Sequence, residues 1–277
     1  MAAAALAPYR SDKFEPFTPY NDAYRLVPTT PYLGSGTSGS VFCCTHKDEL
    51  KPVALKIYNT PSFTSFMSFE PGHKTSYSNT SSYGGNTGDH LISLLPDHPH
   101  LLKYHRFIIK LSDGEILSLT KSELNTFLTT DDSWKSFTIK AVETEYIDGE
   151  NIHGFKDGKR HSLRINEDQF KTIVKVMHFL NEHNFTLGKD IAQNIMIDRF
   201  GCVKFIDFTL LGKGTNTIVF YKTIKILYEC LEPSSFKENL EIYISKLEAH
   251  NKDNTLRHMR DELFLSDPFY QEIITSP

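Results

Sequence analysis

The pattern of apolar and polar residues changes its period part-way along the chain. From about residue 32 to residue 147, apolar residues alternate with polar ones or run together with many β-branched residues, as in VFCCTH, VALKIY, KYHRFIIKL, ILSLT and FTIKAVETEYI. Such runs predict β-strands, and the pair Asp113-Gly114 predicts a turn between two of them. This part of the chain is therefore expected to form a sheet.

After Asn166 the apolar positions take on a helical period. One face of the expected helix carries Phe170, Ile173, Val174, Met177 and Leu180. Asn166 followed three residues later by Gln169 predicts a capping box at its start. Two more helices are expected, one over residues 218–231 and one that begins at a second predicted capping box, formed by Ser235 and Glu238.

Strands first and helices later predict an α+β protein with two lobes. We expect an extended N-terminal arm over residues 1–31, where five prolines lie among polar neighbours, then a β-rich N-lobe over residues 32–147 and a reduced helical C-lobe over residues 148–277. Within the N-lobe, residues 59–88 are expected to form a flexible insertion, because 12 of these 30 residues are Ser or Thr and 4 are Gly.

Composition narrows the class of protein. The 277 residues are 39% hydrophobic and carry a net charge of −4, values typical of a globular protein with a sizeable core. A slightly acidic chain argues against nucleic acid or an anionic membrane as the main partner, and no apolar run is long enough to span a membrane. The four cysteines form no CxxC pair, so we expect reduced thiols and a cytoplasmic setting.

The sharpest motif is a glycine-rich loop of the form G-x-G-x-x-G-x-V. Glycines remove side chains, so that backbone N–H groups can approach phosphate oxygens, although a flexible hairpin turn fits the same residues. VFCCTH reads as a strand, which places the loop between two strands instead of at the start of a helix. The candidate phosphate-binding residues are Gly34, Ser35, Gly36, Thr37, Ser38, Gly39 and Val41.

Lys56 follows 17 residues after Gly39, at the end of the run Val53-Ala54-Leu55-Lys56. On the next strand, its ammonium could reach the α- and β-phosphates of a nucleotide beneath the loop. The alternative is a surface lysine on an edge strand. A lysine within an apolar run must either extend to solvent or meet anions, and together with the loop this favours the phosphate role.

A third motif contains the strand-like runs NIMID (194–198) and VKFID (203–207), separated by a turn at residues 199–201. A hairpin of this kind brings Asn194 and Asp207 to the same end. Amide and carboxylate oxygens suit Mg²⁺, which completes its coordination with phosphate and water. Asp190, just upstream, is placed to accept a proton from a hydroxyl nucleophile. A plain hairpin with turn-capping Asn and Asp side chains is the alternative.

These motifs, in this order, resemble those of the protein-kinase superfamily over about residues 33–211, with Asp207-Phe208-Thr209 in place of Asp-Phe-Gly. The segment from His98 to Leu102 is similar to the one that follows the family's αC helix. The resemblance implies ATP and Mg²⁺ as cofactors, Thr144 as the gatekeeper, Ala54 and Lys56 in the nucleotide site, and an adenine-binding edge made by the backbone of Glu145, Tyr146 and Ile147.

Two positions in the family pattern have more than one candidate. The family places its metal-binding Asn five residues after the catalytic Asp, whereas Asn194 comes four residues after Asp190, so that either Asp190 or Lys189 occupies the base position. The acid that pairs with Lys56 in the family is either Asp89 or Glu70.

The resemblance predicts a protein Ser/Thr kinase that acts on a host or cellular protein. Its compact C-lobe is similar to that of small bacterial effector kinases, so delivery into a host cytosol is a second expected location. The alternatives are a pseudokinase that acts as a binding or scaffolding module, a kinase-fold enzyme with a small-molecule acceptor, transfer of AMP in place of phosphate, and an enzyme that awaits an activating partner or ligand.

Overall fold

The computed structural model describes residues 15–36, 38–47, 49–63, 88–129, 137–156, 159–187, 191–208, 212–213, 217–252 and 266–276. The chain is a mixed α and β protein and divides into two compact units. Unit 1 comprises residues 1–87 and 103–146, and unit 2 comprises residues 88–102 and 147–277. The division at residue 146 lies one residue from the predicted lobe boundary, but residues 88–102 belong with the C-terminal part of the chain.

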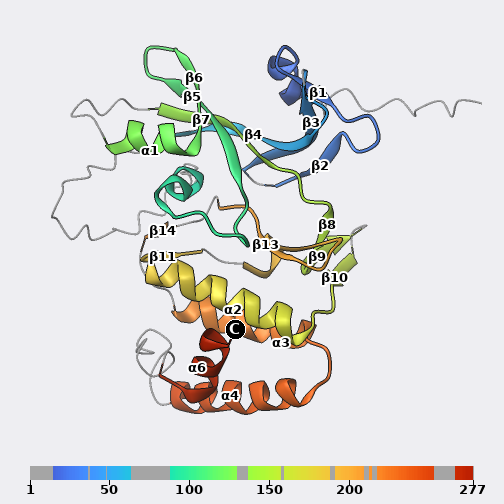
Figure 1. Cartoon of the computed structure of the whole chain (residues 1–277), viewed down its shortest axis with the longest axis vertical. Coiled ribbons are helices and arrows are strands. Elements are labelled where there is room, and N and C mark those ends of the chain that lie inside the picture. The colour runs from blue at the N-terminus through green and yellow to red at the C-terminus, as the bar shows by residue number, and fades with distance from the viewer. Residues whose placement is uncertain are drawn as a thin grey trace, which may run out of the picture. The chain divides into compact units, whose positions relative to one another are not determined.

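Unit 1 is built on one antiparallel sheet (Figure 1). Its strands are β1 (Tyr24–Leu26), β2 (Tyr32–Ser35), β3 (Gly39–His46), β4 (Pro52–Phe63), β5 (Tyr104–Leu111), β6 (Ile116–Leu119) and β7 (Phe137–Glu145). The order across the sheet is β1-β3-β4-β7-β5-β6, with β2 also paired to β3. The strands expected from VFCCTH, VALKIY, KYHRFIIKL, ILSLT and FTIKAVETEYI are all present. β4 continues to residue 63, into the predicted insertion, and residues 64–87 lie outside the described residues.

One face of this sheet carries an apolar cluster. Strand residues alternate between the two faces, and the cluster takes every second residue from β3 and β4, as in Phe42, Cys44, Val53, Leu55 and Ile57. Leu55 and Phe42 are fully buried and lie opposite each other in the β3–β4 ladder. The alternation of apolar residues in the sequence therefore corresponds to the alternation of buried side chains on this face of the sheet.

Residues 15–31 do not form the extended arm that their prolines predicted. Glu15–Tyr20 form the 3₁₀ helix η2, which accommodates Pro16 and Pro19, and β1 follows it. Phe17 is 2% exposed, with its ring centroid 5.4 Å from that of Phe42. Tyr24 is also buried in the apolar cluster. The gain from burying these two aromatic side chains holds the segment on the sheet.

The β5–β6 connection has the predicted turn. Gly114 has φ of +93° and donates its N–H to Leu111 O at 3.0 Å. The sequence patterns did not predict helix α1 (Lys121–Thr129), which follows β6. Thr120 and Glu123 form a capping box at its start: Glu123 N donates to Thr120 Oγ1, and Thr120 N donates to a Glu123 carboxylate oxygen at 2.7 Å.

Unit 2 combines helices with short antiparallel strands (Figure 1). The strands form three small sheets, with the orders β13-β12-β8, β10-β9 and β11-β14. In chain order the elements are η3 (Gly88–Leu94), β8 (Gly149–Asn151), β9 (His153–Lys156), β10 (Lys159–Ser162), α2 (Glu167–Glu182), β11 (Phe185–Thr186), η4 (Ile191–Asn194), β12 (Ile195–Asp198), β13 (Val203–Phe205), β14 (Gly212–Lys213), α3 (Thr217–Cys230), α4 (Ser235–Lys252) and α6 (Pro268–Thr275).

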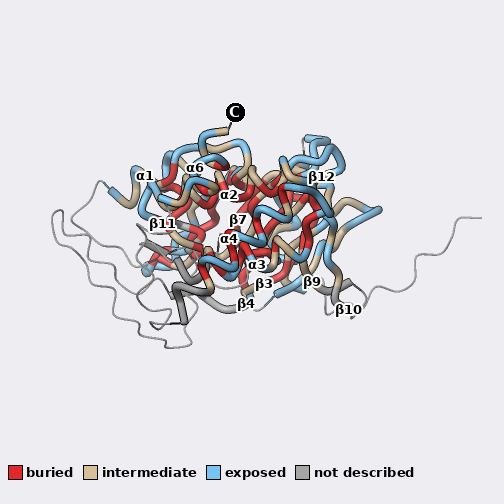
Figure 2. The backbone as a smooth tube through the Cα atoms, turned by 90° about the horizontal axis from the view of Figure 1, so that it is seen from below, coloured by how far each residue is buried: buried red, intermediate tan, exposed pale blue. Residues whose placement is uncertain are grey.

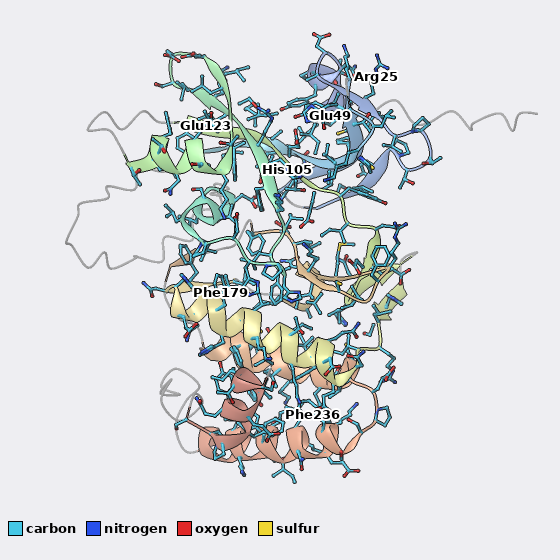
Figure 3. All side chains as sticks on the ribbon, in the orientation of Figure 1. Arg25, Glu49, His105, Glu123, Phe179 and Phe236 are labelled. Atoms are coloured by element: carbon cyan, nitrogen blue, oxygen red, sulfur yellow. The ribbon has the colours of Figure 1, made fainter. Side chains whose placement is uncertain are left out.

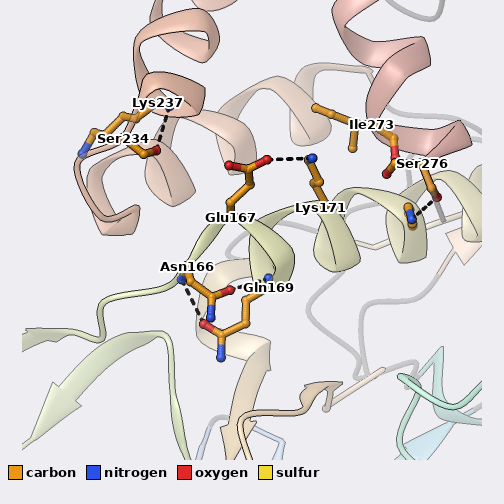
Figure 4. Close-up of polar contacts among 9 residues, drawn as sticks. Asn166, Glu167, Gln169, Lys171, Ser234, Lys237, Ile273 and Ser276 are labelled. Carbon is orange, nitrogen blue, oxygen red and sulfur yellow. Dashed lines mark hydrogen bonds and ion pairs between the residues drawn. The ribbon is translucent and has the colours of Figure 1, made fainter.

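Helix α2 begins at the predicted capping box (Figure 4). Gln169 N donates to Asn166 Oδ1 at 2.9 Å, and Asn166 N donates to the Gln169 side chain at 3.0 Å. The five residues of the predicted apolar face are all buried, and Figure 2 shows buried stretches of the tube, in red, beside the label of α2. Asn166 therefore fixes where the helix starts, and the apolar face fixes its orientation.

Helix α3 lies within one residue of its predicted bounds, and α4 begins at Ser235, one residue before the start that the predicted cap implies. The predicted cap of α4 is wrong by one position. The side chain of Ser234, not Ser235, accepts the bond from Lys237 N at 3.2 Å (Figure 4). Glu238 N donates to Ser234 O instead of being part of a capping box with Ser235. No helix in the described part of the chain is long and apolar enough to cross a membrane.

Replacing Asn166 by alanine tests the cap. Asn166→Ala leaves the Gln169 N–H of the first turn without its acceptor, so we expect a loss of about 1 kcal/mol in the free energy of unfolding. Denaturant unfolding followed by circular dichroism measures the loss, and hydrogen exchange at the Gln169 amide should become faster. Asn166→Asp keeps the acceptor and is the matched control. Equal stability of the alanine and aspartate variants would contradict the assignment of the cap.

Candidate functional site

The glycine-rich loop connects β2 to β3, as predicted, and is a hairpin. Gly34 has φ of +155°, a conformation that other residues rarely adopt. Gly36 N donates to Gly39 O at 2.9 Å, which closes the turn. The N–H of Gly36 is therefore engaged within the hairpin, and contact between this loop and phosphate stays a prediction. Thr37 lies outside the described residues, so the tip of the loop is not placed.

Gly39 holds the base of this loop against β4. A Cβ atom at Gly39 would lie 2.2 Å from Ile57 O and 3.1 Å from Tyr58 Cα, closer than atoms can pack. Asn59 N also donates to Ser38 O at 3.2 Å. The C-terminal end of the loop is therefore held against β4, the strand that carries Lys56.

Lys56 lies on an interior strand. It is opposite Val41 of β3 on one side and Val142 of β7 on the other. This position excludes the alternative of a lysine on a sheet edge. Its ammonium nitrogen lies 5.2 Å from the ring centroid of Tyr58, two residues along the same strand.

The candidate nucleotide residues of unit 1 share one face of the sheet. Val41 pairs with Lys56, and Ala54 pairs with Thr144 of β7. Paired residues point to the same face, as do residues two apart on one strand. These four side chains therefore lie on the face opposite Leu55 and the apolar cluster, in neighbouring rows beside the glycine hairpin.

Cys43 completes the row of Ala54 and Thr144 on this face, since it pairs with Ala54. Burial raises the pKa of its thiol, so that it is a neutral apolar group at neutral pH. Thr144 is 5% exposed, and its hydroxyl lies within hydrogen-bonding distance of Ala54 O at 3.4 Å and of Glu145 O at 3.2 Å. Small, mostly apolar side chains thus form one row, and Lys56 lies in the next.

Part of the expected adenine-binding edge is already hydrogen-bonded within unit 1. Glu145 N donates to Lys103 O at 2.9 Å, and Lys103 N donates to the Glu145 carboxylate at 2.9 Å. β7 is paired to β4 as far as Glu145 and to β5 as far as Thr144, and the backbone N–H of Glu145 is used by the bond to Lys103 O. Of the three residues in the expected edge, only Tyr146 and Ile147 follow the end of the strand.

In unit 2, Asn194 and Asp207 lie at the same end of one hairpin. β12 and β13 pair with Ile195 opposite Phe205, and Asn194 is the residue just before this pair. Ile206 N donates to Asn194 O at 2.7 Å, which extends the pairing to the residue before Asp207. The predicted hairpin is therefore present and places the two candidate magnesium ligands on neighbouring chain segments.

Asp207 has an unusual backbone conformation. Its φ is +52°, in the left-handed region, which few non-glycine residues adopt and in which Asp and Asn are the more frequent exceptions. Phe208, the next residue, is fully buried and anchors the chain on the far side of Asp207. Conformations of this kind in non-glycine residues occur frequently at functional sites.

The segment from His98 to Leu102 supports this hairpin by pairing with β13. Phe205 N donates to His100 O at 2.7 Å, and Leu102 N donates to Phe205 O at 2.9 Å. The His98 ring packs on Phe179 of α2 with 4.5 Å between centroids; Figure 3 labels Phe179. Burial, and then the neighbouring His100, lower the pKa of His98. These contacts attach residues 98–102 to unit 2.

The remaining predicted residues are placed only in part. Asp89 is fully buried in the short 3₁₀ helix η3 (Gly88–Leu94). The other candidate acid, Glu70, lies outside the described residues, as do both candidates for the base position, Lys189 and Asp190. The choice between the two candidates at each of these positions therefore stays a prediction.

Within the described ranges, no group of three or more His, Cys, Asp and Glu residues is arranged to hold a metal ion. A magnesium site of the expected kind uses one carboxylate and one amide and takes its other ligands from phosphate and water. The pair Asn194 and Asp207 has this chemistry. The sequence matches no known protein-family model and no curated protein.

The sequence patterns did not single out Tyr58, although the structure puts it beside the lysine. The signal that could have found it is its spacing: residues two apart on a strand point to the same face, so an aromatic residue at position 58 had to adjoin Lys56.

Two glycines of the loop test its base. Gly39→Ala should force β3 away from β4 and lower the free energy of unfolding by about 1–3 kcal/mol, as overpacking does. Gly36→Ala is the matched control, since among the described residues beyond its chain neighbours no atom lies within 4 Å of its added Cβ. Denaturant unfolding of both variants makes the comparison, and an unchanged midpoint for Gly39→Ala would contradict the close approach to Ile57.

Proposed function

We propose that this protein is an ATP- and Mg²⁺-dependent phosphotransferase that passes the γ-phosphoryl group to a hydroxyl acceptor, with a protein Ser or Thr as the preferred acceptor. The observation that carries the proposal is the shared face of the unit 1 sheet. There the glycine hairpin, Val41, Lys56, Ala54 and Thr144 are neighbours in space although they span about a hundred residues of sequence.

The arrangement in unit 1 suits a nucleotide. A row of small and apolar side chains beside a buried Thr can contact a flat base, whereas the single cation in the next row can contact phosphate oxygens. The hairpin ends at a glycine that packs on β4 without a side chain. A loop of this kind keeps its backbone close to the strand and to any phosphate held there.

The arrangement in unit 2 suits a metal ion. Asn194 and Asp207 supply an amide oxygen and a carboxylate from one end of a hairpin, and Mg²⁺ takes such ligands together with phosphate oxygens. The left-handed backbone at Asp207 marks this residue independently of the motif that contains it.

These residues would act through position and charge. Lys56 would neutralise phosphate oxygens, Asn194 and Asp207 would hold Mg²⁺, and Asp190 or Lys189 would orient the acceptor hydroxyl. Mg²⁺ supplies neutralisation of the charge that develops on the transferred group. Phosphoryl transfer needs little more, because its rate depends mainly on alignment and electrostatic stabilisation.

A second candidate is a nucleotide-binding module without transfer. Asn194 follows Asp190 by four residues where the family has five, and this spacing favours a catalytic loop that no longer positions the acceptor. Such a protein would retain the unit 1 arrangement and ATP binding.

The test is transfer of label from γ-labelled ATP with Mg²⁺ to the protein itself, to a generic substrate and to a cell extract. Lys56→Ala and Asp207→Asn should each lower the rate about 100-fold or more, because each removes charge that stabilises the transferred group. Asp190→Ala distinguishes the two candidate functions. An enzyme would lose turnover, whereas a binding module would keep the function that depends on its partner.

Each control variant makes the same change of charge as a test variant, but at a residue outside the proposed nucleotide and metal sites. Lys110→Ala changes an exposed lysine of β5. Asp198→Asn changes a carboxylate at the other end of the β12–β13 hairpin, where an Asn oxygen can still accept the turn's hydrogen bonds. Both should retain wild-type rates. Equal losses in control and test variants would refute the assigned roles, and label from the α-phosphate alone would indicate transfer of AMP.

A further inference from the structure

The side chain of Lys56 lies against an aromatic ring. Its ammonium nitrogen is 5.2 Å from the centroid of Tyr58, within the range of a cation–π contact. Tyr58 is 7% exposed, so little water competes for the face of its ring. A cation on a desolvated aromatic face is held more firmly than one on an exposed ring.

Tyr58 also lies at the base of the glycine hairpin. Gly39 pairs with Tyr58 in the β3–β4 ladder, and the hydrogen bond from Asn59 N to Ser38 O is adjacent. Tyr58 is therefore both the ring that the Lys56 ammonium contacts and the residue that pairs with Gly39 at the base of the hairpin. This is the end of the shared face at which phosphates would lie under the proposed function.

We propose that Tyr58 is a positioning residue that holds the ammonium of Lys56 at the base of the glycine hairpin, ready for the phosphates of the nucleotide. The inference rests on the proposed function and concerns how its site is prepared. A lysine has four rotatable side-chain bonds, so an ammonium held in place before binding loses less conformational entropy when the phosphate arrives.

The experiment compares binding of Mg-ATP and of adenosine by calorimetry in the whole 277-residue chain. Tyr58→Leu removes the aromatic face and should weaken ATP binding about 2- to 30-fold, the span expected for a cation–π contact, while adenosine binding stays unchanged. Tyr58→Phe keeps the face and should restore ATP affinity to within about 2-fold. Thermal unfolding of each variant shows whether the sheet is intact.

A double-mutant cycle separates positioning from a purely structural role. If Tyr58 acts through Lys56, then Tyr58→Leu should have no further effect on ATP affinity in a Lys56→Ala background. A loss of the same size in both backgrounds would overturn the inference, because it would show that Tyr58 supports the fold or the ligand by another route.

Two outcomes distinguish failure of the inference from failure of the proposed function. Absence of ATP binding, or ATP binding that Lys56→Ala does not weaken, would refute the nucleotide site itself. Binding that depends on Lys56 but not on Tyr58 would refute only the inference. The geometry has its own test without nucleotide: the ε-methylene protons of Lys56 should show a ring-current shift that disappears in Tyr58→Leu and persists in Tyr58→Phe.

Discussion

The register of β4 against its two neighbours is the constraint on which unit 1 depends. From Val53 to Ile57 this strand pairs without interruption to β3 on one side and to β7 on the other. Odd positions enter the apolar cluster, and even positions carry Ala54 and Lys56 to the opposite face. A slip of one residue would bury the lysine among apolar side chains and expose Leu55, so the core that stabilises the sheet also fixes where the cation lies.

A buried carboxylate reinforces this register from the core side. Glu143 is 3% exposed and neighbours Thr144 on β7. Tyr24 donates its hydroxyl to one Glu143 oxygen at 2.6 Å, and His46 Nε2 lies 3.0 Å from the same oxygen. Burial, and then this hydrogen bond, raise the pKa of Tyr24, which therefore stays a donor. A buried carboxylate without partners would be costly. The bond from Tyr24 therefore stabilises Glu143 in the core, and the same bond holds β1 on the sheet.

The sequence patterns predicted those features that depend on local periodicity. The long strands and α2 follow from apolar spacing and from the cap at Asn166, whereas the short β1 depends on the distant partner Glu143, which no local pattern shows.

The cap of α4 was predicted at the wrong residue for another reason. Ser234 and Ser235 carry the same hydroxyl group, and the backbone geometry at the start of the helix decides which of them accepts the bond from Lys237 N. The capping box of Thr120 and Glu123 is also a local pattern, but we made no prediction for residues 121–129, which lie between two strand-like runs. In the candidate site, the motif spacing predicted that Lys56 lies beside the glycine loop. Its contact with Tyr58 could be predicted only from the rule that residues two apart on a strand point to the same face.

Backbone strain gives independent weight to one residue of the site. Among the described residues, Asn184 and Asp207 are the two non-glycine positions with positive φ. Asn184 has a structural explanation: it follows the C-terminal cap of α2, donates its N–H to Asn181 O, and takes the left-handed conformation with which many helices end. No helix ends at Asp207, which lies between the bonded Ile206 and the buried Phe208. A conformation that costs about 1–3 kcal/mol persists only where the surroundings impose it, and here they impose it on the residue that the sequence motif selects as a metal ligand. The motif and the conformation are separate observations, and both mark Asp207.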